Sequence, residues 1–107
     1  MGRIAEVNRY KTELGQYIRT ARERLGMTQK ELADKVGMQY YTAISAIEVG
    51  RNTVPPELYA DFAEALVIPN SEFMREVLRL TDPWAYALLF SDDPRRDVDE
   101  INRRMAD

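Results

Sequence analysis

The sequence of 107 residues contains no cysteine and no histidine. Without cysteine the chain has no disulfide and no thiolate for zinc binding or nucleophilic attack. Without histidine it lacks the commonest metal ligand and general base, so we predict no metal site, no cofactor, no catalytic residue and no enzymatic activity. The longest apolar run, Trp84–Phe90, has seven residues, too few to cross a bilayer, and the charged N-terminus lacks an apolar signal core. We therefore expect a cytoplasmic protein without a membrane partner.

The formal net charge of −3 is distributed unevenly along the chain. Residues 1–54 carry nine lysines and arginines against six acidic residues, whereas residues 55–107 carry six against twelve. A basic first half is typical of a surface that faces phosphates, although an ordinary variation between solvated faces gives the same counts. The distribution is compatible with nucleic-acid binding but does not demonstrate it.

Apolar residues recur at intervals of three and four, the period of an α-helix, and no segment alternates as a half-buried strand does. This pattern predicts an all-α fold. The residues that we expect in its core are Leu14, Ile18, Leu32, Val36, Ile44, Ile47, Phe62 and Leu66. Residues 1–11 are an N-terminal arm or a helical extension, because Lys11 interrupts the apolar stripe. Residues 12–80 are predicted to form the main domain and residues 81–107 a C-terminal helical extension.

The most informative segment is a pair of short helices joined by a turn. Thr28 and Glu31 form a capping box at the start of the first helix. A helix-turn-helix also requires a small residue in the first helix, a turn glycine and apolar anchors on the second, which are present as Ala33, Gly37, Ile44 and Ile47. In this motif the outer face of the second helix enters the major groove of DNA. We therefore predict a helix-turn-helix between about residues 28 and 49.

The ordered set of residues around this motif resembles the XRE family, the phage-repressor and Cro-like helix-turn-helix regulators. The segments that carry the resemblance are Ile18–Arg22, Leu25–Gln29, Glu31–Ala33, Val36–Gly37 and Ile44–Arg51. It covers roughly residues 12–80. The resemblance implies a five-helix, lambda-repressor-like domain that binds a double-stranded DNA operator and regulates transcription.

The resemblance also implies roles for individual residues. Gln29 matches a glutamine that meets phosphate and steadies the recognition helix, and Arg22 and Glu48 match a partly buried salt bridge between the first and third helices. The positions implied to contact base edges or adjoining phosphates are Tyr40, Tyr41, Thr42, Ser45 and Ala46. The positions implied to contact the sugar-phosphate backbone are Arg51, Asn52 and Thr53.

The sequence departs from the family pattern in the turn and on the recognition surface. Between the turn glycine and the first recognition-helix isoleucine lie the six residues Met38–Ala43, one more than in many members, so the register at Gln39 and Tyr40 is open by one position. The surface lacks Arg, Asn or a second Gln for bidentate base contacts and leaves Gln39 as the only such side chain. We expect recognition through phosphates and DNA shape with few direct contacts, among them tyrosine rings and the Ala46 methyl against thymine methyls.

The C-terminal part of the chain has more than one interpretation. The run Trp84–Phe90 covers the back of the domain or forms a dimer interface with the fifth helix. The residues that we predict for such an interface are Phe73, Val77, Trp84, Leu88 and Phe90. We predict a homodimeric repressor on a roughly palindromic operator, with the helix at about residues 41–49 in the major groove. The alternative is a protein-interaction module, such as the antitoxin of a toxin–antitoxin pair, that binds its partner through the acidic C-terminal half.

Overall fold

Seven α-helices and one short 3-10 helix make up the described part of the chain, which contains no strand. The computed structural model describes the backbone of residues 3–106 and the side chains of residues 9–106. The helices are α1 (Arg3–Arg24), α2 (Gln29–Val36), α3 (Tyr41–Glu48), η1 (Pro56–Leu58, 3-10), α4 (Tyr59–Ala65), α5 (Asn70–Thr81), α6 (Pro83–Phe90) and α7 (Pro94–Met105). None of the described helices is both long and apolar enough to span a membrane. The predicted all-α class is confirmed.

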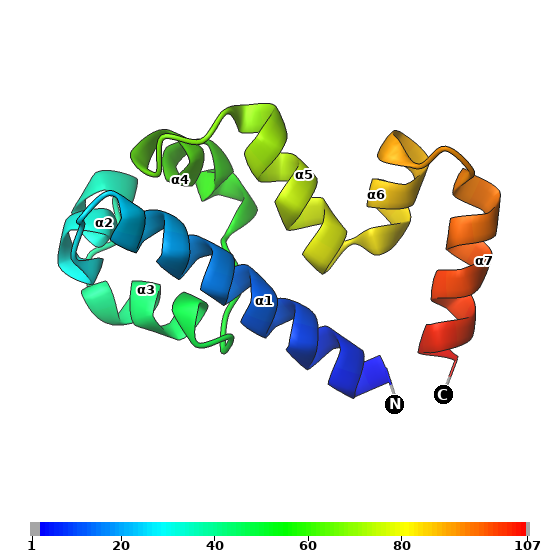
Figure 1. Cartoon of the computed structure of the whole chain (residues 1–107). Coiled ribbons are helices and arrows are strands. Elements are labelled where there is room, and N and C mark those ends of the chain that lie inside the picture. The colour runs from blue at the N-terminus through cyan, green and yellow to red at the C-terminus, as the bar shows by residue number, and fades with distance from the viewer. Residues whose placement is uncertain (1–2, 107) are drawn as a thin grey trace.

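The helices α1–α5 enclose one hydrophobic core (Figure 1). The eight side chains predicted for the core are all buried, with at most 3% of their surface exposed. Phe73, Val77 and Leu80 of α5 complete the core and are equally buried. Burying such a side chain contributes about 1.5–3 kcal/mol. Because helices as short as α2 and α3 are marginal alone, this core is what holds them in place.

The two helices of the predicted motif begin and end as their local sequence dictates. At the start of α2, the Glu31 amide donates to Thr28 Oγ1 at 3.0 Å, and the Thr28 amide donates to Glu31 Oε1 at 3.0 Å, which completes the capping box. Gly37 ends α2 with a φ of 78°, a left-handed conformation that suits glycine. Tyr40 is extended and α3 begins at Tyr41, without a side-chain cap. Gln39 and Tyr40 therefore precede the helix.

α1 extends well beyond the part that supports α2 and α3. Residues 3–11 are helical and continuous with the rest of α1. Of the two alternatives for this segment, an arm or a helical extension, the structure has the helical extension. Residues 1 and 2 of the predicted arm lie outside the described range.

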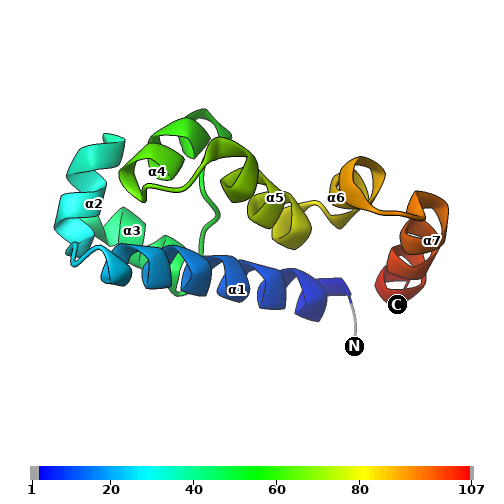
Figure 2. The ribbon, with the colours of Figure 1, turned by 45° about the horizontal axis from the view of Figure 1, so that its top comes forward.

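α6 and α7 form a hairpin at the opposite end of the molecule from α2 (Figures 1 and 2). α7 runs back toward α1, so the start of α1 and the end of α7 lie side by side in both views. Ile101 of α7 is 7% exposed, and Arg104 donates to the Tyr10 hydroxyl of α1 at 2.8 Å. The C-terminal extension is therefore helical and packs back on the domain.

Candidate nucleic-acid interface

α3 buries its two isoleucines and presents its opposite face to solvent. Tyr40 and Tyr41, at the start of this face, are 64% and 54% exposed. The other residues predicted at the bases are the exposed Gln39 and Thr42 and the half-buried Ser45 and Ala46. All six positions are thus exposed or half-buried, two of them in the turn before α3 and four on the helix itself. The major groove of DNA is wide enough to admit such a helix.

The loop after α3 folds back on that helix. The amides of Arg51 and Asn52 donate to the Ala46 carbonyl at 2.9 and 3.3 Å. The side chains of Arg51, Asn52 and Thr53 are exposed. The main-chain bonds therefore hold three polar side chains, one of them cationic, beside the outer face of α3. Side chains of these types are suited to phosphate contacts at the edge of a groove.

A buried ion pair joins α1 to the end of α3. The Arg22 guanidinium donates from Nε to Glu48 Oε2 at 2.6 Å and from Nη2 to Glu48 Oε1 at 3.0 Å. Its Nη1 donates to the Met27 carbonyl at 2.7 Å. Arg22 and Glu48 are 8% and 3% exposed, and the hydrogen bond to Glu48 raises the pKa of Arg22 above its ordinary value. Such a bidentate pair fixes direction as well as distance, so it orients α3 on α1.

Gln29 links the same carboxylate to the first turn of α2. Its Nε2 donates to Glu48 Oε1 at 3.0 Å, and the residue is half-buried. A side-chain amide carries two hydrogens on nitrogen, so one remains for a phosphate oxygen. The structure therefore shows Gln29 attached to the end of α3, a contact that the sequence-based reasoning did not specify, while its phosphate contact stays a prediction.

Val49 is an exposed residue of the outer face that the sequence-based prediction missed. It caps α3, follows Ala46 by three positions and is 52% exposed. Helical periodicity was the available signal, because residues three apart lie on one face. On the outer face of α3, Ala46 and Val49 present methyl groups, and Tyr41 and Thr42 present hydroxyl groups. The side-chain amide next to this face belongs to Gln39, in the turn before the helix. Methyl groups favour contact with the C5-methyl of thymine.

The prediction that Phe73 and Val77 belong to a dimer interface is wrong. These side chains are 0% and 1% exposed and lie within the core of the single chain. α5 packs against both α1 and α4, and the Phe73 ring lies beside the rings of Tyr17 in α1 and Tyr59 in α4. The apolar periodicity of α5 predicts a buried stripe but does not say whether the chain itself or a second copy covers it.

The remaining predicted interface residues lie on α6. Leu88 and Phe90 are 68% and 40% exposed, and neighbouring Leu89 is 65% exposed. Trp84 is half-buried, and its Nε1 donates to Asn102 Oδ1 at 2.8 Å. Beside them an open cavity of about 500 Å³ is lined by Trp84, Leu88, Pro94, Arg95 and Val98. The hairpin thus leaves an apolar surface exposed.

Two short helices packed across a longer one, with the outer face of the second exposed, define the helix-turn-helix class of DNA-binding domains. A model of the helix-turn-helix domain family matches residues 13–73, more than half of the chain. The protein therefore belongs to this helix-turn-helix family, which is typical of XRE-like regulators, and the resemblance seen in the sequence is confirmed. No curated protein matches the chain significantly.

Proposed function

We propose that the protein is a sequence-specific, non-enzymatic regulator of transcription that places α3 in the major groove of a DNA operator. The observation that carries the proposal is the exposed outer face of α3, which the Arg22–Glu48 pair and Gln29 hold in one orientation. Repression is the simplest outcome, because a protein on the operator excludes RNA polymerase. The site of action is then the bacterial-type cytoplasm, on the nucleoid.

Selection from a pool of random duplexes tests this proposal, with the full chain and several salt concentrations. We expect a consensus sequence and an affinity that falls steeply as salt rises. Tyr41→Ala and Gln29→Ala weaken binding to the selected duplex, and Arg51→Ala weakens it and lowers the salt dependence, because one phosphate contact is lost. Arg103→Ala on α7 is the matched control, since it removes the same charge at the far end of the molecule (Figure 1).

Two results would count against DNA regulation. One is a selection that enriches no sequence. The other is weak binding that responds equally to Arg51→Ala and Arg103→Ala, because such binding depends on total charge and not on α3.

We further propose that the regulator acts as a homodimer through α6. One module of this size buries little surface for tight specific binding, and a two-fold dimer matches a palindromic operator. Leu88, Leu89 and Phe90 are the exposed apolar side chains that a second copy would cover. The two recognition helices would then enter major grooves about 34 Å apart, or a multiple of that distance.

Sedimentation at micromolar concentration tests the dimer. The unmodified chain should sediment as a dimer, and Leu88→Glu should be a monomer because it places a charge in the interface. Val67→Glu is the control, since Val67 is 74% exposed and lies outside α6. A monomer in all three cases, together with a protein that co-purifies at fixed stoichiometry through the same apolar surface, would favour the antitoxin-like alternative.

A further inference from the structure

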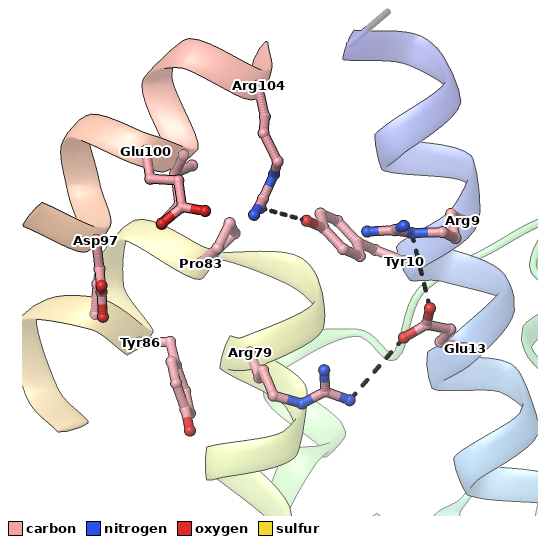
Figure 3. A pocket seen from close by; sticks show the side chains of 11 residues that line it. Arg9, Tyr10, Glu13, Arg79, Pro83, Tyr86, Asp97, Glu100 and Arg104 are labelled. Carbon is pink, nitrogen blue, oxygen red and sulfur yellow. Dashed lines mark hydrogen bonds and ion pairs between the residues drawn. The ribbon is translucent and has the colours of Figure 1, made fainter. Parts of the chain in front are cut away.

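A second candidate binding site lies between the start of α1 and the C-terminal hairpin. This groove has a volume of about 410 Å³, and its walls come from α1, the end of α5, α6 and α7 (Figure 3). The buried residues Pro83, Ala87 and Ile101 supply its apolar lining. Binding sites for small molecules typically have volumes of about 300–1,000 Å³, an apolar lining and a few convergent polar groups. The volume of the groove lies in this range, and polar side chains make up most of its lining.

The charges on the α1 side of the groove compensate one another. The Glu13 carboxylate lies 3.7 Å from Arg9 Nε and 4.0 Å from Arg79 Nη2, as the dashed lines in Figure 3 show. Arg79 also forms an ion pair with Glu76. These groups therefore offer little unneutralised charge to a ligand.

The α7 side of the groove is different. Arg104 donates to the Tyr10 hydroxyl at 2.8 Å, and neither Arg104 nor Glu100 forms an ion pair with any residue that the structure describes. These two residues lie one helical turn apart and line the same groove (Figure 3). Asp97, the third charged residue of α7 in the groove, accepts hydrogen bonds from the Ser91 hydroxyl and from Arg96. Among the described residues, one guanidinium and one carboxylate of this groove thus form no close ion pair, although they are neighbours on α7.

We propose that this groove binds a small zwitterion that carries a carboxylate and an ammonium group, as a free amino acid or a short peptide does. The ligand carboxylate would lie against Arg104, whose planar guanidinium binds carboxylates well, and against the Tyr10 hydroxyl. The ligand ammonium group would lie against Glu100. Ala87 and Ile101 would contact its apolar part. A zwitterion contacts both charged side chains at once, whereas a ligand with a single charge contacts only one of them, which is why the zwitterion is preferred.

The position of the groove suggests what such a ligand does. It would contact α1, on which α3 is oriented, and α7, which is joined to α1 by the bond from Arg104 to Tyr10. A ligand that bridges the two helices stabilises the docked position of the hairpin. Because α6 carries the proposed dimer surface, the ligand would regulate dimerisation, and this consequence, unlike the binding itself, depends on the proposed function.

Nuclear magnetic resonance titration of the full, DNA-free chain tests the proposal. The probes are free L-amino acids added one at a time, the dipeptide Ala-Ala, and acetate and methylammonium as ligands with one charge. We expect saturable shifts of amides around Tyr10, Ala87 and Glu100 with a zwitterion, but not of those in α3, and at least tenfold weaker binding of acetate and methylammonium. The comparison of amino acids with the dipeptide identifies which source the groove accepts.

Variants separate the proposed contacts from a general effect of charge. Glu100→Gln and Arg104→Gln should each weaken zwitterion binding at least tenfold, and Tyr10→Phe should weaken it less, because it removes only the hydroxyl. Arg103→Gln, which carries the same charge change on α7 outside the groove, should bind as the unmodified chain does. Circular dichroism checks that every variant is folded.

Three results would overturn the proposal: no saturable shift with any zwitterion, equal affinity for acetate and for the amino acids, or unchanged binding in both Glu100→Gln and Arg104→Gln. Since no DNA is present, these results are independent of whether the chain regulates transcription.

Discussion

A single glycine sets how closely α1 approaches the end of α3. A Cβ atom at Gly15 would lie 2.5 Å from the Ile47 carbonyl oxygen and closer still to that of Glu48. Both obstacles are backbone atoms, so a larger residue would push the two helices apart. Glycine is therefore required here by packing, although it weakens a helix.

We predict that Gly15→Ala destabilises the protein by about 1–3 kcal/mol, the usual cost of overpacking. Helix propensity alone predicts the opposite sign, a gain of about 1 kcal/mol. Urea unfolding measures the difference, and Gln16→Ala, at the next and exposed position, is the control. An unchanged or increased stability of Gly15→Ala would show that α1 and α3 are not in close contact.

The buried ion pair leads to a second prediction at the scale of the residue. Glu48→Gln leaves the Arg22 guanidinium buried without a counter-charge, so we expect a loss of about 3–5 kcal/mol in the free energy of unfolding. Glu23→Gln is the control, because Glu23 pairs with Arg19 at 3.4 Å on the exposed surface of α1. We expect that exposed pair to contribute at most about 1 kcal/mol. Equal effects of the two variants in urea unfolding would contradict a structural role for the buried pair.

The methyl-rich face of α3 predicts how bases are recognised. Replacing thymidine by deoxyuridine at operator positions opposite Ala46 and Val49 removes only the C5-methyl group of the base. Burial of one such group contributes about 0.8 kcal/mol, so we expect a loss of about fourfold in affinity. Val49→Ser should reduce this sensitivity at its own position. Duplexes that bind equally well with uracil at every thymine would show that the methyl groups are not contacted.

At the scale of the element, the capping box makes the stability of α2 depend on pH. The Thr28 amide, followed by the Thr28 hydroxyl, holds the pKa of Glu31 below its ordinary value. A carboxylate with a lowered pKa in the folded state contributes stability above its unfolded pKa, about 4.3. This contribution is lost as the pH falls through the folded pKa.

Urea unfolding between neutral and acidic pH measures this dependence. Glu31→Gln should remove this loss of stability on acidification, whereas Thr28→Ala should reduce it less, because the amide at position 28 still donates to Glu31. Thr28→Ala should in addition cost about 1 kcal/mol at neutral pH. The double variant should show the same pH dependence as Glu31→Gln alone. Separate, additive effects of the two substitutions would indicate that Thr28 and Glu31 act independently.

The elements of the helix-turn-helix were predicted well because their signals are local. The capping residues, Gly37 and the apolar period of α2 lie within a few positions of one another in the chain. The start of α3 was open by one residue, since Tyr40 supplies no side-chain cap to mark it. Phe73 and Val77 were assigned to a dimer interface because the surface that covers their apolar stripe belongs to helices distant in sequence.

At the scale of the whole molecule, the buried residues of the hairpin lie outside the main core. The core cluster draws its buried residues from Leu14 to Leu80, whereas Ala87 and Ile101 lie outside it. We predict that a chain ending at Thr81 remains helical and unfolds cooperatively, but binds only a single half-site and sediments as a monomer. Circular dichroism and sedimentation test both parts. An unfolded truncated chain would show that α6 and α7 are needed for the fold.

The sequence by itself determined the all-α class, the capped α2, the turn and the eight core positions, because each follows from helical period and from contacts between near neighbours. Only the tertiary structure decided the close approach at Gly15, the bond from Gln29 to Glu48 and the return of α7 to Tyr10. The two hydrogen bonds join residues that are 19 and 94 positions apart in the sequence. Their geometry depends on how whole helices pack, which no local pattern specifies.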